Sequence, residues 1–318
     1  EERAEESVRD EMQAVRGALE ELGHAHRDLA ILSDTPLISV ANLIHSLQPD
    51  VVFNLVDSVR GNSSLEMAIP AMLDLMQIPY TGSPALTLGL CQDKWKAKAV
   101  LRAHKIRVPW GVMISPGDDS VNFKRFPLIV KPVHEDGSLG INANRVVWNS
   151  LEALRQISEV HWAYMQPALV EEYIEGREFG VGVIDFNGGP KPFPVSEIVF
   201  DNYPEGIPHI VTYNSKWNEK TVEYKYSVPV CPAIISEALS DKIKKIAMQV
   251  FHAFGCRGYA RIDIRLRDDK IYVIDVNPNP DIAPPCGIGN VIAAGGVSYA
   301  EFINELLLGV RRKSDARK

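Results

Sequence analysis

The first part of the chain alternates between helical and extended hydrophobic patterns. Apolar residues spaced by three and four predict an opening helix that ends at Gly23. Short apolar runs at 29–32 and 50–56 predict buried strands, and a helical pattern over 38–47 separates them. Strands that alternate with helices are typical of βαβ units, so we expect a parallel sheet here. Because this α/β domain begins with a helix, we expect its first strand to be missing.

The rest of the chain continues as a mixture of helices and strands. Three segments have helical periodicity: 65–76, 93–104 and 235–253. Three segments have the character of strands: 126–132, 168–174 and 179–185. A polar, aromatic stretch over 213–226 is expected to be a loop. We therefore expect an α/β protein with three lobes, over residues 1–90, 91–178 and 179–318.

A hairpin is predicted near the carboxyl end of the chain. Residues 259–266 and 271–277 alternate between apolar and polar side chains on either side of a polar turn. Since side chains alternate between the two faces of a strand, Asp263 and Asp275 are expected to face each other about 5 Å apart between Cβ atoms.

Arg261 and Asn277 share the polar face of this hairpin with the two aspartates. Two carboxylates and an amide provide hard oxygen ligands, which suit Mg²⁺ or Mn²⁺ better than zinc. The alternative for this segment taken alone is an ordinary solvated face of an amphipathic hairpin.

A lysine followed by a glycine-containing loop is a candidate phosphate site. Lys131 ends a predicted strand and precedes residues 134–140, whose backbone N–H groups could close over a phosphate. The spacing is not that of a P-loop, in which Gly-Lys-Ser/Thr opens a helix. A flexible surface loop is the more ordinary interpretation of this segment on its own.

Composition narrows the class of protein. The 318 residues are 46% hydrophobic and carry a net charge of −7, which argues against a nucleic-acid groove. The four cysteines are scattered, as in a protein of a reducing compartment. No stretch approaches the roughly 20 apolar residues of a membrane span, and no signal peptide is recognisable. We expect a cytoplasmic protein with neither a nucleic-acid nor a membrane partner.

Six segments resemble, in order, those of the D-alanine–D-alanine ligase family of the ATP-grasp superfamily. They are 78–83 with Asp93, Lys94 and Lys98; 128–132 with 135–140; 170–178; 213–216; 258–263; and 274–280. Each segment is a modest signal, but their shared order makes the resemblance specific. It implies an ATP-grasp fold with an N-terminal Rossmann-like lobe and with ATP held between the two following lobes.

The resemblance also implies an activity and a site. Family members join a carboxylate to an amine through an acylphosphate, with ATP and Mg²⁺ (or Mn²⁺) as cofactors and small molecules as partners, and dimers are common among them. The implied ATP contacts are Lys94, Lys131, Ser138, Glu171, Tyr173, Ile174 and Glu178. The implied metal ligands are Asp263, Asp275 and Asn277, and the implied catalytic residues are Arg261, Lys216 and Tyr213. Arg261 would stabilise the oxyanion of the tetrahedral state.

Departures from the family pattern concern the substrates. Gly137-Ser138 stands where the family has two serines, and Asp275 replaces a glutamate. Asp281 replaces a glycine, and Cys286 lies near the position of a serine that meets the second substrate's carboxylate. An anionic Asp281 disfavours a nucleophile that carries a carboxylate. We expect substrates other than two D-alanines; the alternatives are a true D-alanine–D-alanine ligase and a non-catalytic nucleotide-binding module.

Overall fold

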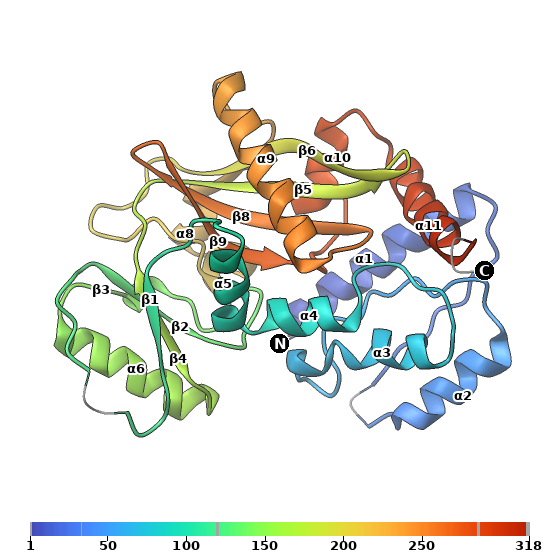
Figure 1. The fold of residues 1–318 in the computed structure, drawn as a ribbon, viewed down its shortest axis with the longest axis horizontal. Helices are drawn as coiled ribbons and strands as arrows, with labels where there is room; N and C mark the ends of the chain where they lie inside the picture. The colour runs from blue at the N-terminus through green and yellow to red at the C-terminus, as the bar shows by residue number, and fades with distance from the viewer. Residues whose placement is uncertain (1, 33, 119–120, 285–286, 316–318) are drawn as a thin grey trace.

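The computed structural model describes residues 2–32, 34–118, 121–284 and 287–315. Helices surround two antiparallel sheets (Figure 1). The small sheet has the order β1-β4-β2-β3, and its strands are β1 (Gly111–Ile114), β2 (Leu128–Pro132), β3 (Val146–Val147) and β4 (Ala168–Glu172). The large sheet has the order β7-β6-β5-β8-β9, and its strands are β5 (Arg177–Phe186), β6 (Gly189–Phe200), β7 (Ser227–Val230), β8 (Tyr259–Arg267) and β9 (Lys270–Asn277).

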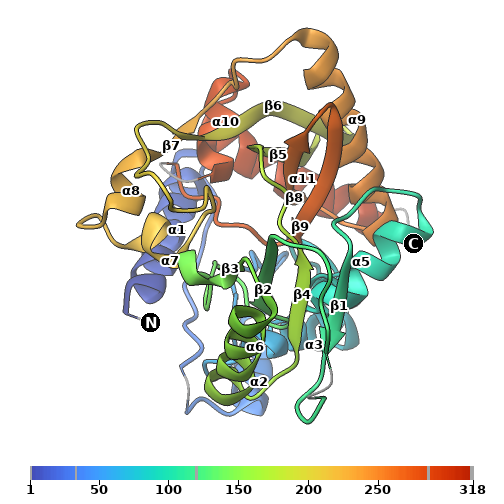
Figure 2. The ribbon, with the colours of Figure 1, turned by 90° about the vertical axis from the view of Figure 1, so that its left-hand side faces the viewer.

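Each sheet is covered by helices that bury its apolar side chains. The small sheet packs on α6 (Ser150–Tyr164). One face of the large sheet packs on α9 (Glu237–Phe254) and α5 (Lys94–Ala103). Its other face packs on α10 (Gly287–Ala294), α11 (Tyr299–Asp315) and the opening helix α1 (Glu2–Glu21). Because side chains alternate along β5, one strand supplies both cores. Figure 2 shows the small sheet below the edge of the large sheet formed by β8 and β9.

The N-terminal segment is mostly helical. It contains α2 (Leu37–Leu47), a short 3₁₀ turn η1 (Ser63–Leu65), α3 (Ala68–Leu75) and α4 (Ala85–Gln92). Neither of the strands expected at 29–32 and 50–56 forms within the described part of this segment. One parallel bridge joins Val52 to Tyr80. A strand exists only through its ladder with a neighbour, so these extended runs without a longer ladder remain irregular.

The prediction of a loop over 213–226 is wrong. The chain there forms two short helices, α7 (Tyr213–Trp217) and α8 (Val222–Tyr226). Each begins after a threonine whose hydroxyl accepts a backbone N–H, Thr212 from Ser215 and Thr221 from Tyr224. These N-caps satisfy amide groups that a helix start leaves without partners, which is how five-residue helices persist among polar residues.

The predicted hairpin is confirmed as β8 and β9, with Asp263 directly opposite Asp275. The pairing depends on a bulge, because Ile264 pairs with Val273 and Ile274 is left as the extra residue. A regular hairpin about the turn at 268–269 would place Ile274, not Asp275, opposite Asp263.

No single helix in the described ranges is long and apolar enough to cross a membrane. The pair 287–294 and 299–312 meets the length and composition criterion only jointly, and it is bent by 103°.

Candidate active site

A cavity of about 3080 Å³ runs between the two sheets and reaches the N-terminal segment. The structure brings all of the predicted site residues to its walls. They come from α5, β2, the loop after β2, β4, β5, α7, β8 and β9, with Tyr173 and Ile174 in the connection after β4. Tertiary folding thus collects residues that lie up to 183 positions apart, from Lys94 to Asn277.

The polar face of the hairpin forms one wall of this cavity. The guanidinium of Arg261 donates to both carboxylate oxygens of Asp263, at 2.8 and 3.0 Å. That carboxylate holds the pKa of Arg261 above its ordinary value. On the facing strand, burial would raise the pKa of Asp275, but Lys94, with Nζ 3.7 Å from Oδ1, and other cations hold it below its ordinary value. Asp275 is therefore ionised and faces cations.

The hairpin donors suit a hard cation. Within the described chain, no group of three or more histidine, cysteine, aspartate or glutamate side chains has metal-site geometry. Asp263 and Asp275 are only two carboxylates, and Asn277 adds an amide oxygen that already accepts the N–H of Asn279 at 3.0 Å. Such an incomplete oxygen set fits Mg²⁺, which usually takes its remaining ligands from water and substrate phosphates.

Lys94 is the first residue of α5 and reaches across the cavity. Asp93 caps the helix by accepting the N–H of Lys96 at 2.9 Å. The ammonium of Lys94 lies 3.0 Å from Oδ1 of Asp136, in the glycine-containing loop. Burial opposes its charge, but Asp136 and Asp275 hold the pKa of Lys94 above its ordinary value. Lys94 therefore keeps its positive charge, and a phosphate could take the place of Asp136 as its partner.

Glu171 on β4 is enclosed by two lysines. Lys131 on β2 lies 2.7 Å from one carboxylate oxygen, and Lys98 on α5 lies 2.7 Å from the other. Burial alone would raise the pKa of Glu171, but the two ammonium groups hold it below its ordinary value. Each oxygen retains a further lone pair, so Glu171 can still accept a hydrogen bond from a ligand. Lys98 was not among the predicted site residues.

The glycine-containing loop lies under α7. Gly137 and Ser138 adopt left-handed φ values of 61° and 63°. The indole N–H of Trp217 donates to the carbonyl of Gly137 at 3.3 Å, and the N–H of Tyr213 donates to that of Ile141 at 3.0 Å. These contacts hold α7, which also carries Lys216, over the cavity.

Lys216 is a cation whose charge is disfavoured. Burial, and then the neighbouring charge of Arg261, lower the pKa of Lys216.

Arg265 contacts three of the predicted ATP residues, Tyr173, Ile174 and Glu178, although it was not among the predicted site residues itself. It is 3% exposed and donates to the carbonyl of Ile174 at 3.1 Å. It also pairs with Glu178 and stands 5.5 Å over the ring of Tyr173. The signal was available, because residues 261, 263 and 265 share one face of a strand.

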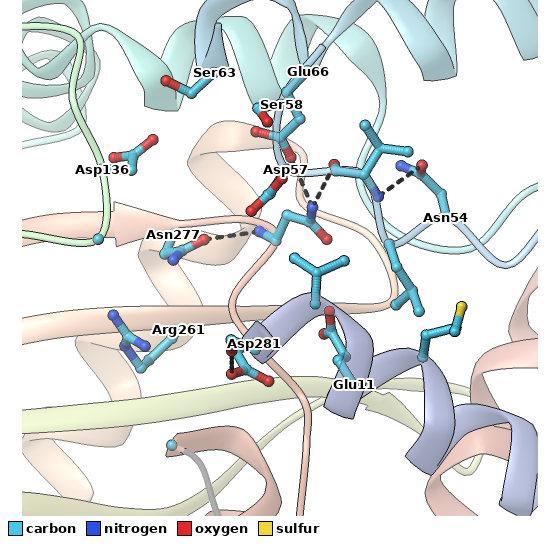
Figure 3. A pocket seen from close by; sticks show the side chains of 18 of the residues that line it. Glu11, Asn54, Asp57, Ser58, Ser63, Glu66, Asp136, Arg261, Asn277 and Asp281 are labelled. Carbon is cyan, nitrogen blue, oxygen red and sulfur yellow. Dashed lines mark hydrogen bonds between the residues drawn. The ribbon is translucent and has the colours of Figure 1, made fainter. Parts of the chain in front are cut away.

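One end of the cavity is rich in carboxyl groups (Figure 3). We call it the acidic end and define it by Glu11, Asp57, Glu66 and Asp281. Glu11 accepts the N–H of Ile282 at 3.0 Å.

Hydrogen bonds also hold Asp281 and Glu66 in this end. Asp281 accepts from the Ser7 hydroxyl at 2.7 Å, and Glu66 accepts from Asn279 at 2.8 Å. Burial raises the pKa of both Glu11 and Glu66 to about 8. The predicted substrate position Cys286 lies outside the described residues.

The chain is similar to known proteins over most of its length. The family model for the C-terminus of D-ala D-ala ligase matches residues 117–308. The uncharacterized protein y4sG of Sinorhizobium fredii is 31% identical over 302 residues, covering 92% of this chain and 85% of that protein. D-alanine–D-alanine ligase B of Brucella melitensis is 31% identical over 272 residues, covering 84% and 80%.

Solved structures share the fold. The D-alanine–D-alanine ligase of Bacillus anthracis superposes with a TM-score of 0.74 at 19% identity, over 98% of this chain and 95% of that one. A structure of the ligase from the same organism complexed with ATP gives 0.68 at 21% identity, over 88% and 85%. The described chain thus has the ATP-grasp fold.

Proposed function

Since the chain belongs to the D-alanine–D-alanine ligase family and is an ADP-forming ATP-grasp ligase, we propose that it joins a carboxylate to an amine and that these two substrates are not two D-alanines. A carboxylate oxygen attacks the γ-phosphorus of ATP and ADP leaves, which makes an acylphosphate. The amine then attacks the carbonyl carbon, phosphate leaves, and the nitrogen loses a proton. Phosphoryl transfer of this kind depends mainly on positioning and on neutralising charge.

The cavity offers a residue for each of these needs. Lys94 and Lys131 neutralise the phosphates of ATP, while Glu178 and the backbone near Tyr173 and Ile174 receive the nucleoside. Asp263, Asp275 and Asn277 hold Mg²⁺, which supplies charge neutralisation at the phosphate oxygens when bound.

The remaining predicted residues serve the acyl group and the closed cavity. Arg261 is oriented by its two hydrogen bonds to Asp263 and stabilises the oxyanion of the tetrahedral state. Lys216 and Tyr213 close over the acyl group from α7, and Ser138 closes from the loop beneath it.

The choice of substrates depends on the acidic end. The segment that carries Asp281 contacts α1 through Glu11, and Figure 3 shows Arg261 and Asp281 in the same part of the cavity. An amine bound beside Arg261 therefore lies near these carboxyl groups. A carboxylate attached to that amine would meet the like charge of Asp281, whereas a neutral or cationic group would not be repelled. We infer an amine substrate without a neighbouring carboxylate.

This inference is tested by ATP-dependent phosphate release across amino acids, peptides, and amines that lack a carboxylate. The wild type should use an amine of the last class with kcat/KM at least about tenfold above that for D-alanine, the preference expected from about 1.4 kcal/mol of charge discrimination. Asp281→Gly should narrow this ratio, and Asp268→Gly, in the exposed hairpin turn, should leave it unchanged.

A true D-alanine–D-alanine ligase is the second candidate, because several relatives carry that name. D-alanine as the best substrate of the wild type would establish it and would exclude our substrate assignment. Binding of ATP without turnover of any pair would instead identify a nucleotide-binding module.

A further inference from the structure

Lys98 is a buried cation that none of the proposed catalytic steps uses. It lies one turn after Lys94 on α5, and Figure 2 shows this helix beside the small sheet. It is only 3% exposed and does not line the cavity, whereas Glu171 and Lys131 do. Its ammonium lies 2.7 Å from Glu171 and has no other hydrogen-bond partner in the described structure. Among the described residues, Glu171 is therefore the side chain through which Lys98 contacts the site.

The second lysine is not needed to neutralise Glu171. Lys131 already lies 2.7 Å from the other oxygen, and a single pair would leave this part of the core without net charge. Burying one more ammonium is unfavourable by several kcal/mol before its interactions are counted. Burial, with the repulsion from Lys131, lowers the pKa of Lys98. A neutral hydrogen-bond donor would satisfy the second oxygen of Glu171 without this cost, so pairing that oxygen does not by itself require a charge.

The extra charge changes what Lys131 can offer a ligand. With Lys131 and Glu171 alone, the carboxylate would cancel the charge of the lysine toward the cavity. With Lys98 behind it, the carboxylate is shared between two ammonium groups and the three side chains carry a net charge of +1. The three side chains together therefore still attract a phosphate. Because the site is shielded from water, this attraction is strong.

We propose that Lys98 is a positioning residue for nucleotide binding, which holds the second oxygen of Glu171 and so leaves Lys131 a net positive charge for the phosphates of ATP. This proposal rests on the proposed role of Lys131 at the nucleotide. It extends the nucleotide site to a side chain that the ligand never touches.

The test measures binding of AMP-PNP with Mg²⁺ by calorimetry, without any carboxylate or amine. Lys98→Met should weaken binding about tenfold, equivalent to about 1.4 kcal/mol. In turnover assays KM for ATP should rise similarly, while kcat changes less than about threefold. Lys96→Met is the matched control, because Lys96 lies on the same helix but its side chain is 66% exposed. It should bind as the wild type does.

A double-variant cycle tests the route through Glu171. In a Glu171→Gln background, Lys98→Met should change the affinity less than about threefold, because the carboxylate through which it acts is gone. An equal loss in both backgrounds would show that Lys98 acts independently of Glu171 and would overturn the proposal. A Lys98→Met protein with a lower Tm but wild-type affinity would also overturn it, since that is the result of a structural role.

If Lys98→Met does not fold, Lys98→Gln provides the same test. Its amide can still donate to Glu171, so no buried oxygen is left unpaired, but the charge is absent. Weakening by about fivefold, or about 1 kcal/mol, supports the proposal, and unchanged affinity overturns it. A wild type that does not bind AMP-PNP with Mg²⁺ would instead refute the proposed function, so the two failures are distinguishable.

Discussion

At the scale of single residues, Glu11 shows how burial changes a carboxyl group in this site. It is 7% exposed, and Asp281 and Asp57 add to the effect of burial. Its pKa is raised from the ordinary 4.5 to about 8. Between these two values the folded protein holds a proton that the unfolded chain has released. Stability from this group is therefore complete below pH 4.5 and is lost as the pH rises toward 8.

Glu11→Gln should remove this part of the pH dependence, because glutamine imitates the protonated side chain. In urea denaturation, the variant should gain stability relative to the wild type between pH 5.5 and 7.5, by at most about 1.4 kcal/mol per pH unit. Glu21→Gln, on the exposed side of the same helix, is the control and should follow the wild type. Parallel curves for wild type and Glu11→Gln would contradict the raised pKa.

Among single residues, the sequence indicated the side chains that line the cavity more readily than the side chains that hold them in place. Lys131 and Glu171 were selected from the motifs in which they stand, and both line the cavity. Lys98 stands in one of the resembling segments and Arg265 on the polar face of the hairpin, but neither has a predicted role, because their importance comes from the side chains they meet across the fold. An interval along the chain does not reveal a contact between α5 and β4.

At the scale of elements, the connection between β4 and β5 depends on one glycine. Gly176 separates Ile174 from Glu178 and adopts a φ of +144°, which side-chain-bearing residues rarely adopt. A Cβ at this position would collide with the carbonyl oxygen of Leu266 on β8. The close approach of the two backbones therefore requires a residue without a side chain.

Gly176→Ala should lower the free energy of unfolding by about 2 to 3 kcal/mol through backbone strain and overlap. Gly309→Ala in α11 is the matched substitution, because nothing lies within 4 Å of its Cβ and helices favour alanine. It should be neutral or stabilising by up to about 1 kcal/mol. Chemical denaturation measures the free energy of unfolding of both variants. Equal changes would show that the close approach of the two backbones at Gly176 does not require a glycine.

Most elements with a strong repeating pattern were predicted correctly, and the errors have a common origin. Helix α9 and strands β2, β4 and β5 correspond to their predicted segments within a few residues. The runs at 29–32 and 50–56 have strand character, but a strand also needs a partner, which a local pattern does not specify. Helices α7 and α8 were missed because their signal is a threonine cap rather than a repeat.

At the scale of the whole molecule, the cavity lies between two sheets that are linked mainly through helices and loops. A ligand that contacts both sheets should therefore hold them together. Lys131 stands on the small sheet, while Asp275 and Arg261 stand on the large one. Residues of the N-terminal segment complete the same cavity.

Mg²⁺ with ATP should accordingly raise the Tm of the whole chain in a single transition. At a free concentration about 100 times Kd, the stabilisation should be about 2.7 kcal/mol. Asp275→Asn should lose the part of this shift that depends on Mg²⁺, whereas Asp269→Asn, in the exposed turn of the same hairpin, should keep it. Two separate transitions, of which only one responds to nucleotide, would contradict a ligand bound by both sheets.

The sequence by itself determined the types of side chain in the site, their order along the chain and the hairpin on which the proposed metal ligands stand. These are local properties, because side-chain chemistry and strand alternation depend only on neighbouring residues. Only the tertiary structure decided the alignment of those donors. The bulge at Ile274 brings Asp275 opposite Asp263, and the position of α5, which packs on the large sheet, brings Lys98 to Glu171 on β4. Both outcomes depend on contacts between distant segments, which no local pattern contains.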